Sequence, residues 1–144
     1  MPAIAMPPQL KHGDRLSRDE FERRYLGMPS VRKAELIEGI VRMPSPVRIH
    51  RHAKPHLRLS LWLGFYEIRT PGTEAGSDAT VRLGSNTEVQ PDVLLRILPE
   101  FGGQSQTSKD GYVEGSPEFV AEVAASSVSF DLHQKREIYR QNGV

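Results

Sequence analysis

A glutamate stands in the middle of a stretch that otherwise resembles a buried strand. In PEFVAEVAASS, residues 117–127, Glu122 has apolar or small residues on both sides. An unpaired charge in a protein interior is strongly unfavourable, so this carboxylate needs a partner, a proton or a metal ion. Any fold of this chain therefore has to place a compensating group beside Glu122.

The first half of the chain has helical and extended patterns in turn. Ser17 stands where the N-cap of a helix is expected, three residues before a glutamate. Residues 34–43 contain two apolar runs on either side of Glu38 and Gly39, which predicts a tight β-hairpin. Residues 55–66 fit a strand with alternating leucines as well as an amphipathic helix, and the wider apolar face favours the helix.

The second half predicts further strands and a closing helix. The order of these elements indicates a mixed α/β domain, with a small mixed sheet that begins with the hairpin and is flanked by helices. We expect a turn at 70–79, strands at 79–83 and 88–97, a loop at 101–111, the strand that contains Glu122, and a helix at 131–143.

Three more polar residues occupy positions where apolar residues are expected. At 100° per residue, Lys135 falls inside the apolar face of the last helix, so it either extends out to solvent or reaches a buried anion. Asp92 opens an apolar run, where a turn or cap residue is the ordinary alternative. Glu35 lies in the hairpin, where it could equally be an exposed carboxylate on an edge strand.

Together these residues have the chemistry that metal-assisted hydrolysis of a phosphodiester requires. Carboxylate oxygens hold Mg²⁺ while leaving positions open for water and phosphate, and the ion neutralises developing charge. A lysine can orient or deprotonate the attacking water and stabilise the transition state. Asp92, Glu122 and Lys135 would then satisfy one another around a cation.

Four sequence phrases occur in order along the chain: AELIEG, QPDVLL, PEFVAEVAASS and FDLHQKREIYRQNGV. In this order and spacing they resemble the bacterial Uma-type family of restriction-endonuclease-like proteins, a branch of the PD-(D/E)XK nuclease superfamily. The resemblance runs from about Ser17 to Val144. It implies a restriction-endonuclease-like core and an endonuclease that uses Mg²⁺ or Mn²⁺ and acts on DNA.

The resemblance also implies a role for each candidate residue. Asp92 matches the aspartate of the PD motif and Glu122 the metal-binding glutamate, so both would be metal ligands. The superfamily lysine is expected two positions after Glu122, where this chain has Ala124. Resembling proteins of this branch supply it from the following helix, where Lys135 stands, and Glu35 matches a hairpin glutamate that would assist catalysis.

A basic, histidine-rich stretch precedes the second predicted helix. Three imidazoles within seven positions could bind Zn²⁺, although the spacing is not a known zinc pattern and the chain has no cysteine. The alternative is a positively charged surface that contacts the nucleic-acid backbone. By resemblance, His52 would contact phosphate or a site carboxylate. The stretch contains His50, His52 and His56 together with Arg48, Arg51, Lys54 and Arg58.

Length and composition bound the organisation of the chain. Its 144 residues suffice for one domain with a core, and the absence of cysteine excludes disulfides. The N-terminus lacks a leader pattern and no run is long enough to span a membrane, so we expect a cytoplasmic protein. We also expect a flexible arm at 1–13 and one nuclease-like domain at 14–144, without the final strand found in resembling proteins.

A second interpretation is a non-catalytic nucleic-acid-binding or interaction module that keeps the nuclease fold. Geometry separates the two, because catalysis requires Asp92, Glu122 and Lys135 to converge within a few ångströms. A homodimer is compatible with the catalytic interpretation, since cleavage of both DNA strands needs two sites. No membrane partner is expected.

Overall fold

The computed structural model describes residues 5–44, 49–124 and 129–144. It confirms the mixed α/β architecture. None of the helices in these ranges is long and apolar enough to cross a membrane. The helical elements are α1 (Arg18–Leu26), a π-helical turn η1 (Ile49–Ala53), α2 (Lys54–Arg69), a 3₁₀ turn η2 (Pro99–Phe101) and α3 (Ser129–Gln141). The strands are β1 (Glu35–Ile37), β2 (Ile40–Arg42), β3 (Thr73–Ser77), β4 (Val81–Leu83), β5 (Thr87–Val89), β6 (Val93–Ile97), β7 (Gln106–Thr107), β8 (Val113–Glu114) and β9 (Phe119–Ala121).

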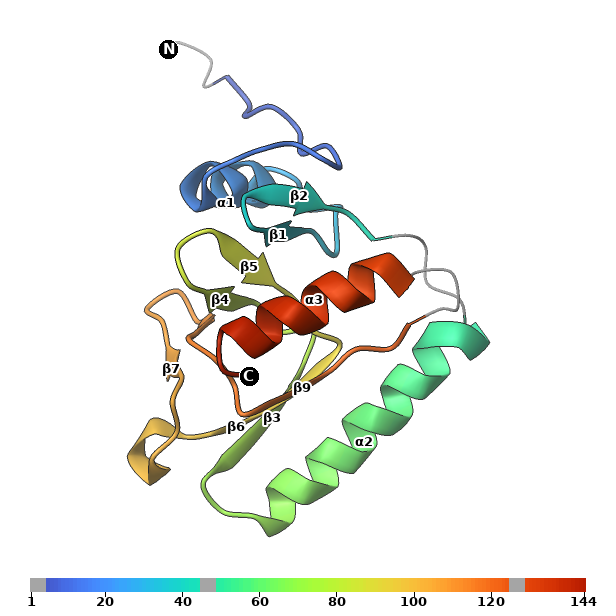
Figure 1. The fold of residues 1–144 in the computed structure, drawn as a ribbon, viewed down its shortest axis with the longest axis vertical. Coiled ribbons are helices and arrows are strands. Elements are labelled where there is room, and N and C mark those ends of the chain that lie inside the picture. The colour runs from blue at the N-terminus through green and yellow to red at the C-terminus, as the bar shows by residue number, and fades with distance from the viewer. Residues whose placement is uncertain (1–4, 45–48, 125–128) are drawn as a thin grey trace.

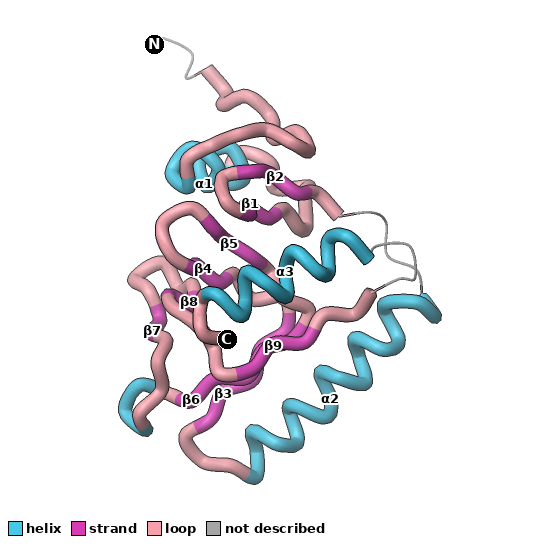
Figure 2. Tube along the Cα trace, viewed as in Figure 1, coloured by secondary structure: helices cyan, strands magenta, loops and turns pink. Residues whose placement is uncertain are grey.

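The strands form two sheets. One has the order β2-β1-β5-β4-β8-β7 and the other the order β3-β6-β9. The paired strands are antiparallel except for β4 and β8, which run parallel. Figure 1 shows α3 crossing the middle of the molecule between the two sheets, while α2 runs along the side of the three-stranded sheet and packs against β3 and β6. The same division is visible in Figure 2, where the hairpin and α1 lie at the N-terminal end.

Two apolar clusters hold these layers together. The larger one joins α3 to both sheets, because Ile138 and Tyr139 of α3 pack among strand residues such as Val81 and Leu94. The smaller one centres on Phe21 of α1 and the hairpin. Leu10, from the segment expected to be a flexible arm, is only 4% exposed and belongs to this smaller cluster.

The local signals for the first helix, the hairpin and α2 are confirmed. The hydroxyl of Ser17 accepts a hydrogen bond from the backbone N–H of Glu20 at 3.3 Å, as an N-cap does. The hairpin turn has positive φ at both central residues, 50° at Glu38 and 78° at Gly39, which is the combination that a two-residue turn with matching twist requires. The ambiguous segment 55–66 is helical and forms most of α2.

The segment predicted as one strand over 88–97 is instead two strands in two different sheets. Pro91 has no N–H to donate to a strand ladder and also restricts the backbone of Gln90, so β5 ends there and β6 begins after it. Asp92 consequently stands in the short connection between the two sheets.

Two other strands lie in segments that were expected to be irregular. The predicted turn at 70–79 contains β3, which pairs with β6 from Thr73 opposite Ile97 to Ser77 opposite Val93. The predicted loop at 101–111 contains β7, which pairs with β8. Both segments are polar or Gly-rich in sequence, so local preference does not predict a strand there. Their strand conformation depends more on pairing with a neighbouring strand.

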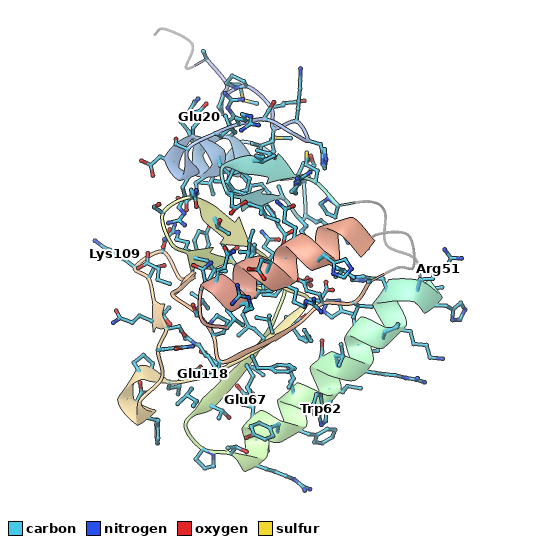
Figure 3. All side chains as sticks on the ribbon, in the orientation of Figure 1. Glu20, Arg51, Trp62, Glu67, Lys109 and Glu118 are labelled. Carbon is cyan, nitrogen blue, oxygen red and sulfur yellow. The ribbon has the colours of Figure 1, made fainter. Side chains whose placement is uncertain are left out.

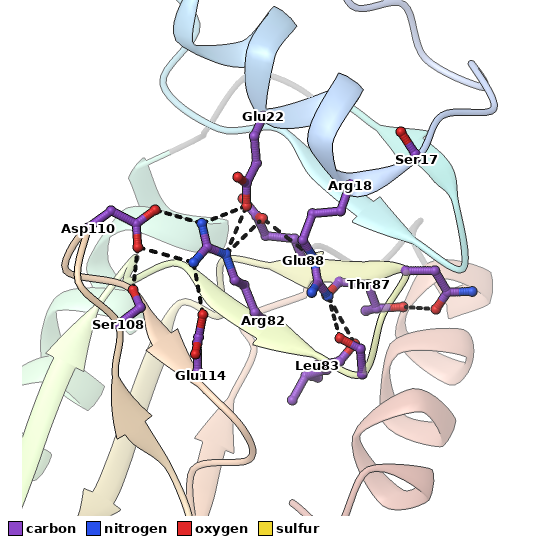
Figure 4. A network of polar contacts seen from close by, with 12 residues as sticks. Ser17, Arg18, Glu22, Arg82, Leu83, Thr87, Glu88, Ser108, Asp110 and Glu114 are labelled. Carbon is purple, nitrogen blue, oxygen red and sulfur yellow. Dashed lines mark hydrogen bonds and ion pairs between the residues drawn. The ribbon is translucent and has the colours of Figure 1, made fainter.

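A network of charged side chains connects α1 to the six-stranded sheet (Figure 4). At its centre Arg82 of β4 forms ion pairs of 2.7–3.1 Å, and it lies 3.7 Å from the buried Glu88 of β5. Burial and the neighbouring acid Glu22 raise the pKa of Glu88 to about 8, against the opposite effect of Arg82. The close partners of Arg82 are Glu22, Asp110 and Glu114.

The natural chain should lose stability as pH rises from about 4.5 to 8, and Glu88→Gln should abolish this loss. The folded pKa of Glu88 lies above the ordinary 4.5, so the native state keeps a proton that the unfolded chain releases. Stability is then fully present below pH 4.5 and falls as pH rises, by at most about 1.4 kcal/mol per pH unit from this group. Denaturant unfolding from pH 5 to 8.5 measures the slope. Equal slopes for both proteins would contradict the prediction, and Glu114→Gln is the control because this carboxylate is exposed.

Candidate active site

Glu122 lies directly after β9, and its carboxylate meets two donors on α3. The ammonium of Lys135 is 2.5 Å from Oε1 of Glu122, and the hydroxyl of Tyr139 donates a hydrogen bond of 2.7 Å to the same oxygen. The side chains of Glu122 and Lys135 are only 14% and 10% exposed. The carboxylate in the apolar stretch is therefore partnered by a buried ammonium and a phenol.

Lys135 joins this carboxylate to a second one on the hairpin. Oε1 of Glu35 accepts hydrogen bonds from Lys135 Nζ at 2.9 Å and from the backbone N–H of Gln90 at 2.8 Å. Glu35 is 6% exposed, and β1 lies between β2 and β5, so the alternative of an exposed edge-strand carboxylate does not hold. Lys135 thus points inward and joins Glu122 to Glu35 of the hairpin, which lies 100 residues before Lys135 in sequence.

The balance of charge in this group is negative, because two carboxylates share one ammonium. Burial raises the pKa of Glu122, and the Glu35 carboxylate adds to the effect, although Lys135 and Tyr139 oppose it. Burial alone would lower the pKa of Lys135, but the two carboxylates outweigh it and raise that pKa above its ordinary value. Burial and both carboxylates also raise the pKa of Tyr139 well above 10, so this phenol remains a hydrogen-bond donor.

Asp92 stands next to this group through the backbone of the residue after Glu122. The N–H of Val123 donates to Oδ2 of Asp92 at 2.7 Å. The other oxygen, Oδ1, lies 3.1 Å from Nε2 of His52 and 3.4 Å from Nζ of Lys33. Burial by itself would raise the pKa of Asp92, but the Val123 hydrogen bond and the nearby cationic side chains lower it below its usual value. Asp92 is therefore held as a carboxylate although it is only 2% exposed.

The histidine-rich stretch divides into an inward and an outward part. His52 on η1 faces the Asp92 carboxylate, and Nε2 of His56 lies 2.7 Å from the backbone oxygen of Asp92. His50 is exposed. Of the cationic residues expected to contact nucleic acid, Arg48 lies outside the described residues, and Figure 3 shows Arg51 at the start of the long helix. Arg51, Lys54 and Arg58 are exposed.

A cleft of about 640 Å³ opens beside the Glu122 and Lys135 pair, between β9 and α3. Asp92 and Glu35 do not belong to its wall and lie deeper in the molecule. Three basic side chains of α3 share the wall, which gives the cleft a positive rim around an acidic centre. These are His133, Arg136 and Arg140.

The donor chemistry of Glu122 and Asp92 suits a hard divalent cation. Lys135 and Tyr139 both approach Oε1 of Glu122, and Oε2 has no hydrogen-bond partner among the residues that the structure describes. Carboxylate oxygens with a net negative charge are the ligands that Mg²⁺ and Mn²⁺ prefer. Glu122 and the neighbouring Asp92 could hold such an ion, with Glu35 behind Lys135.

Several groups at this site were not singled out from the sequence. Tyr139 was placed in the apolar face of the last helix, yet its position one turn after Lys135 was a signal that its hydroxyl could reach the same carboxylate. Lys33 carries no such signal, because it lies in a polar segment before the hairpin. The backbone donors of Gln90 and Val123 follow from the tertiary fold alone.

Comparisons with known proteins concern the family and the fold. A family model described as "Uma2: Putative restriction endonuclease" matches residues 18–144. Among solved structures, one described as a "putative nuclease belonging to DUF820" from Anabaena variabilis superposes with a TM-score of 0.56 at 16% identity. The match covers 78% of this chain and 63% of that chain, and at this identity the likeness concerns the fold alone. No curated protein matches.

Proposed function

Because the chain belongs to the Uma2 family ("Putative restriction endonuclease"), we propose that it is a metal-dependent endonuclease that hydrolyses phosphodiester bonds in DNA. The observation that carries the proposal is the position of Lys135. Its buried ammonium lies within 2.9 Å of two carboxylates, Glu35 and Glu122, and faces a cleft with a basic rim. A lysine that served only to neutralise buried carboxylates would not need to line such a cleft.

In this proposal Asp92 and Glu122 hold Mg²⁺ or Mn²⁺. A divalent ion bound there supplies charge neutralisation at the reacting phosphate and lowers the pKa of a bound water. The donors around Asp92 keep it ionised and oriented, while Tyr139 fixes one oxygen of Glu122. The carboxylates are therefore preorganised as ligands before any ion arrives.

Lys135 and Glu35 act as a pair in the same proposal. Glu35, fixed by the backbone N–H of Gln90, orients the ammonium of Lys135. The ammonium then orients the attacking water and stabilises the negative charge that develops on the phosphate oxygens. In this arrangement Lys135 takes the place of the superfamily lysine that is absent at Ala124.

Nucleic acid is the proposed partner, held mainly through its phosphates. The basic side chains of α3 line the cleft, and a second set is exposed at the start of α2. Such contacts bind the backbone without reading the bases, and the affinity should fall steeply as salt rises. The second set comprises Arg51, Lys54 and Arg58. Arg48 of the same basic stretch and His52 beside Asp92 complete the proposed nucleic-acid contacts.

Incubation of the protein with supercoiled plasmid DNA tests the proposal. Nicking or linearisation should appear with Mg²⁺ or Mn²⁺ and disappear when a chelator is added. Asp92→Asn should lose this activity. Salt-dependent DNA binding without any metal-dependent cleavage would contradict the proposal and favour the non-catalytic nucleic-acid-binding module instead.

A homodimer is the last part of the proposal, and we place its interface on α2. Four large apolar side chains follow one another at helical spacing and are each more than half exposed, which marks an interaction surface. A second copy is the occupant we propose, since double-strand cleavage needs two active sites. These side chains are Leu57, Leu61, Phe65 and Ile68.

Replacing Leu61 and Phe65 by glutamate should halve the molecular mass measured by light scattering, because two charges would be buried in the interface. The fold should persist, since both side chains are more than half exposed within one chain. Met6→Glu is the control, because Met6 is 81% exposed and belongs to the N-terminal segment before α1. A natural chain with the mass of one copy would refute the dimer.

A further inference from the structure

Asp92 has a second group of possible metal donors, provided by η1 and α2. One ligand atom each from His52, His56 and Asp92 lie within 4.8 Å of one another. Nε2 of His52 is 3.1 Å and 3.2 Å from the two carboxylate oxygens. The two imidazole rings stand nearly perpendicular, with their centroids 5.5 Å apart. Two donors one helical turn apart thus converge with a third from the connection between β5 and β6.

The chemistry of these donors differs from that of the Glu122 side. Imidazole nitrogens suit zinc and similar transition-metal ions such as cobalt, whereas magnesium and manganese prefer oxygen ligands. Zn–N bonds are about 2.0–2.1 Å long, so the donors of a tetrahedral site lie about 3.4 Å apart. The cluster therefore needs to contract by at most about 1.4 Å, within the reach of side-chain rotation.

The charges around the cluster decide whether an ion can enter. Lys33 is the competing cation, since its ammonium is 3.4 Å from Oδ1 of Asp92. Its side chain is 21% exposed, so it can extend into solvent when another cation takes its place. His56 Nε2 contacts Ser77 Oγ at 2.8 Å and the backbone oxygen of Asp92 at 2.7 Å, contacts that ion binding would exchange for a metal bond.

From this geometry we infer that His52, His56 and Asp92 form a binding site for one transition-metal ion that favours nitrogen ligands, such as zinc or cobalt. The site leaves a fourth position open, as catalytic zinc sites do. It shares Asp92 with the proposed Mg²⁺ site but not Glu122. The binding itself does not depend on nuclease activity, so it goes beyond the proposed function.

Titration of the metal-free protein with Co²⁺ tests the site without DNA. The natural chain should bind Co²⁺ with the visible absorption of a four-coordinate nitrogen and oxygen site, and Zn²⁺ should displace it. His52→Gln combined with His56→Gln should weaken binding by at least about 100-fold, since two of three ligands are lost. His50→Gln is the matched control and should bind like the natural chain, because His50 is exposed. Equal affinity of the double variant and the natural chain would overturn the inference.

Two further variants keep the test independent of folding and of the proposed nuclease site. Lys33→Met should strengthen Co²⁺ binding several-fold, because the competing positive charge is removed; unchanged or weaker binding would contradict Asp92 as a ligand. Glu122→Gln should leave the cobalt spectrum unchanged, since Glu122 is not a ligand of this site. Loss of DNA cleavage in Glu122→Gln with an intact cobalt spectrum separates the two sites. Circular dichroism confirms that each variant is folded.

Discussion

Lys135→Met should lower the free energy of unfolding by about 3–5 kcal/mol in metal-free buffer at neutral pH. The ammonium is the shared partner of Glu35 and Glu122, and all three side chains are at most 14% exposed. Its removal leaves two buried carboxylates facing each other, which costs more than a lost surface ion pair. Urea denaturation of both proteins measures the difference, and DNA cleavage should be lost as well.

The loss should depend on pH in a direction that follows from Glu122. Its pKa is already raised by burial and rises further when Lys135 is gone. A carboxyl whose folded pKa is raised contributes stability below its ordinary pKa of 4.5 and loses it as pH rises. The deficit of Lys135→Met should thus shrink toward pH 4.5 and grow toward pH 8.

Two controls make this prediction specific to the buried pair. Adding Glu122→Gln to Lys135→Met should restore much of the stability, because one of the two unpaired charges is removed. Arg136→Met, one position further along α3, should change stability little, since Arg136 is exposed. If Lys135→Met is as stable as the natural chain, the ammonium does not hold the two carboxylates together.

The parts of the site that local sequence could predict are those set by one element. Helical periodicity placed Lys135 in the apolar face of α3, and apolar or small residues on both sides marked Glu122 as buried, although the strand ends at Ala121, just before it. The structure brings their charges to 2.5 Å. Neither inference needed the tertiary fold, because each rests on spacing within a single helix or strand.

The surroundings of Asp92 could not be predicted in the same way. Its partners Lys33 and His52 are 59 and 40 residues away. The family resemblance implied that His52 contacts phosphate or a site carboxylate, whereas nothing in the sequence around Lys33 points to Asp92. The break at Pro91 was visible as a proline, but its consequence, that β5 and β6 enter different sheets, depends on which strands they pair with. Long-range contacts, and not local propensity, therefore decide which residues surround Asp92 and which sheet each of these strands enters.

The fold also changes the meaning of the histidine-rich stretch. From sequence, zinc binding and a basic surface were alternatives for the whole stretch. The structure assigns the two alternatives to different residues of the stretch. His52 and His56 face Asp92, while His50, Arg51 and Arg58 are exposed. A helical stretch can serve both purposes since its opposite faces meet different surroundings.

Glu122→Gln should reduce Mg²⁺-dependent cleavage of plasmid DNA by about 10²–10³-fold or more while leaving the protein folded. An amide is a far poorer ligand for Mg²⁺ than a carboxylate, so the ion would be held weakly or not at all. The same amide oxygen can still accept from Lys135 and Tyr139, which now hold Oε1 of Glu122. Since Glu35 remains to pair with Lys135, we expect little change in the free energy of unfolding.

This combination separates a metal ligand from a structural ion pair. If Glu122 served only to neutralise Lys135, the variant would be less stable but would cleave DNA as the natural chain does. Glu118→Gln is the matched control on the same side of the cleft, because Glu118 lines its wall but contacts backbone N–H groups of Ile97 and Gln104 instead of Lys135. Full activity in Glu122→Gln, measured at equal protein and Mg²⁺ concentrations, would rule out Glu122 as a ligand. A loss in Glu122→Gln without one in Glu118→Gln would identify the Glu122 carboxylate as a ligand of the catalytic ion.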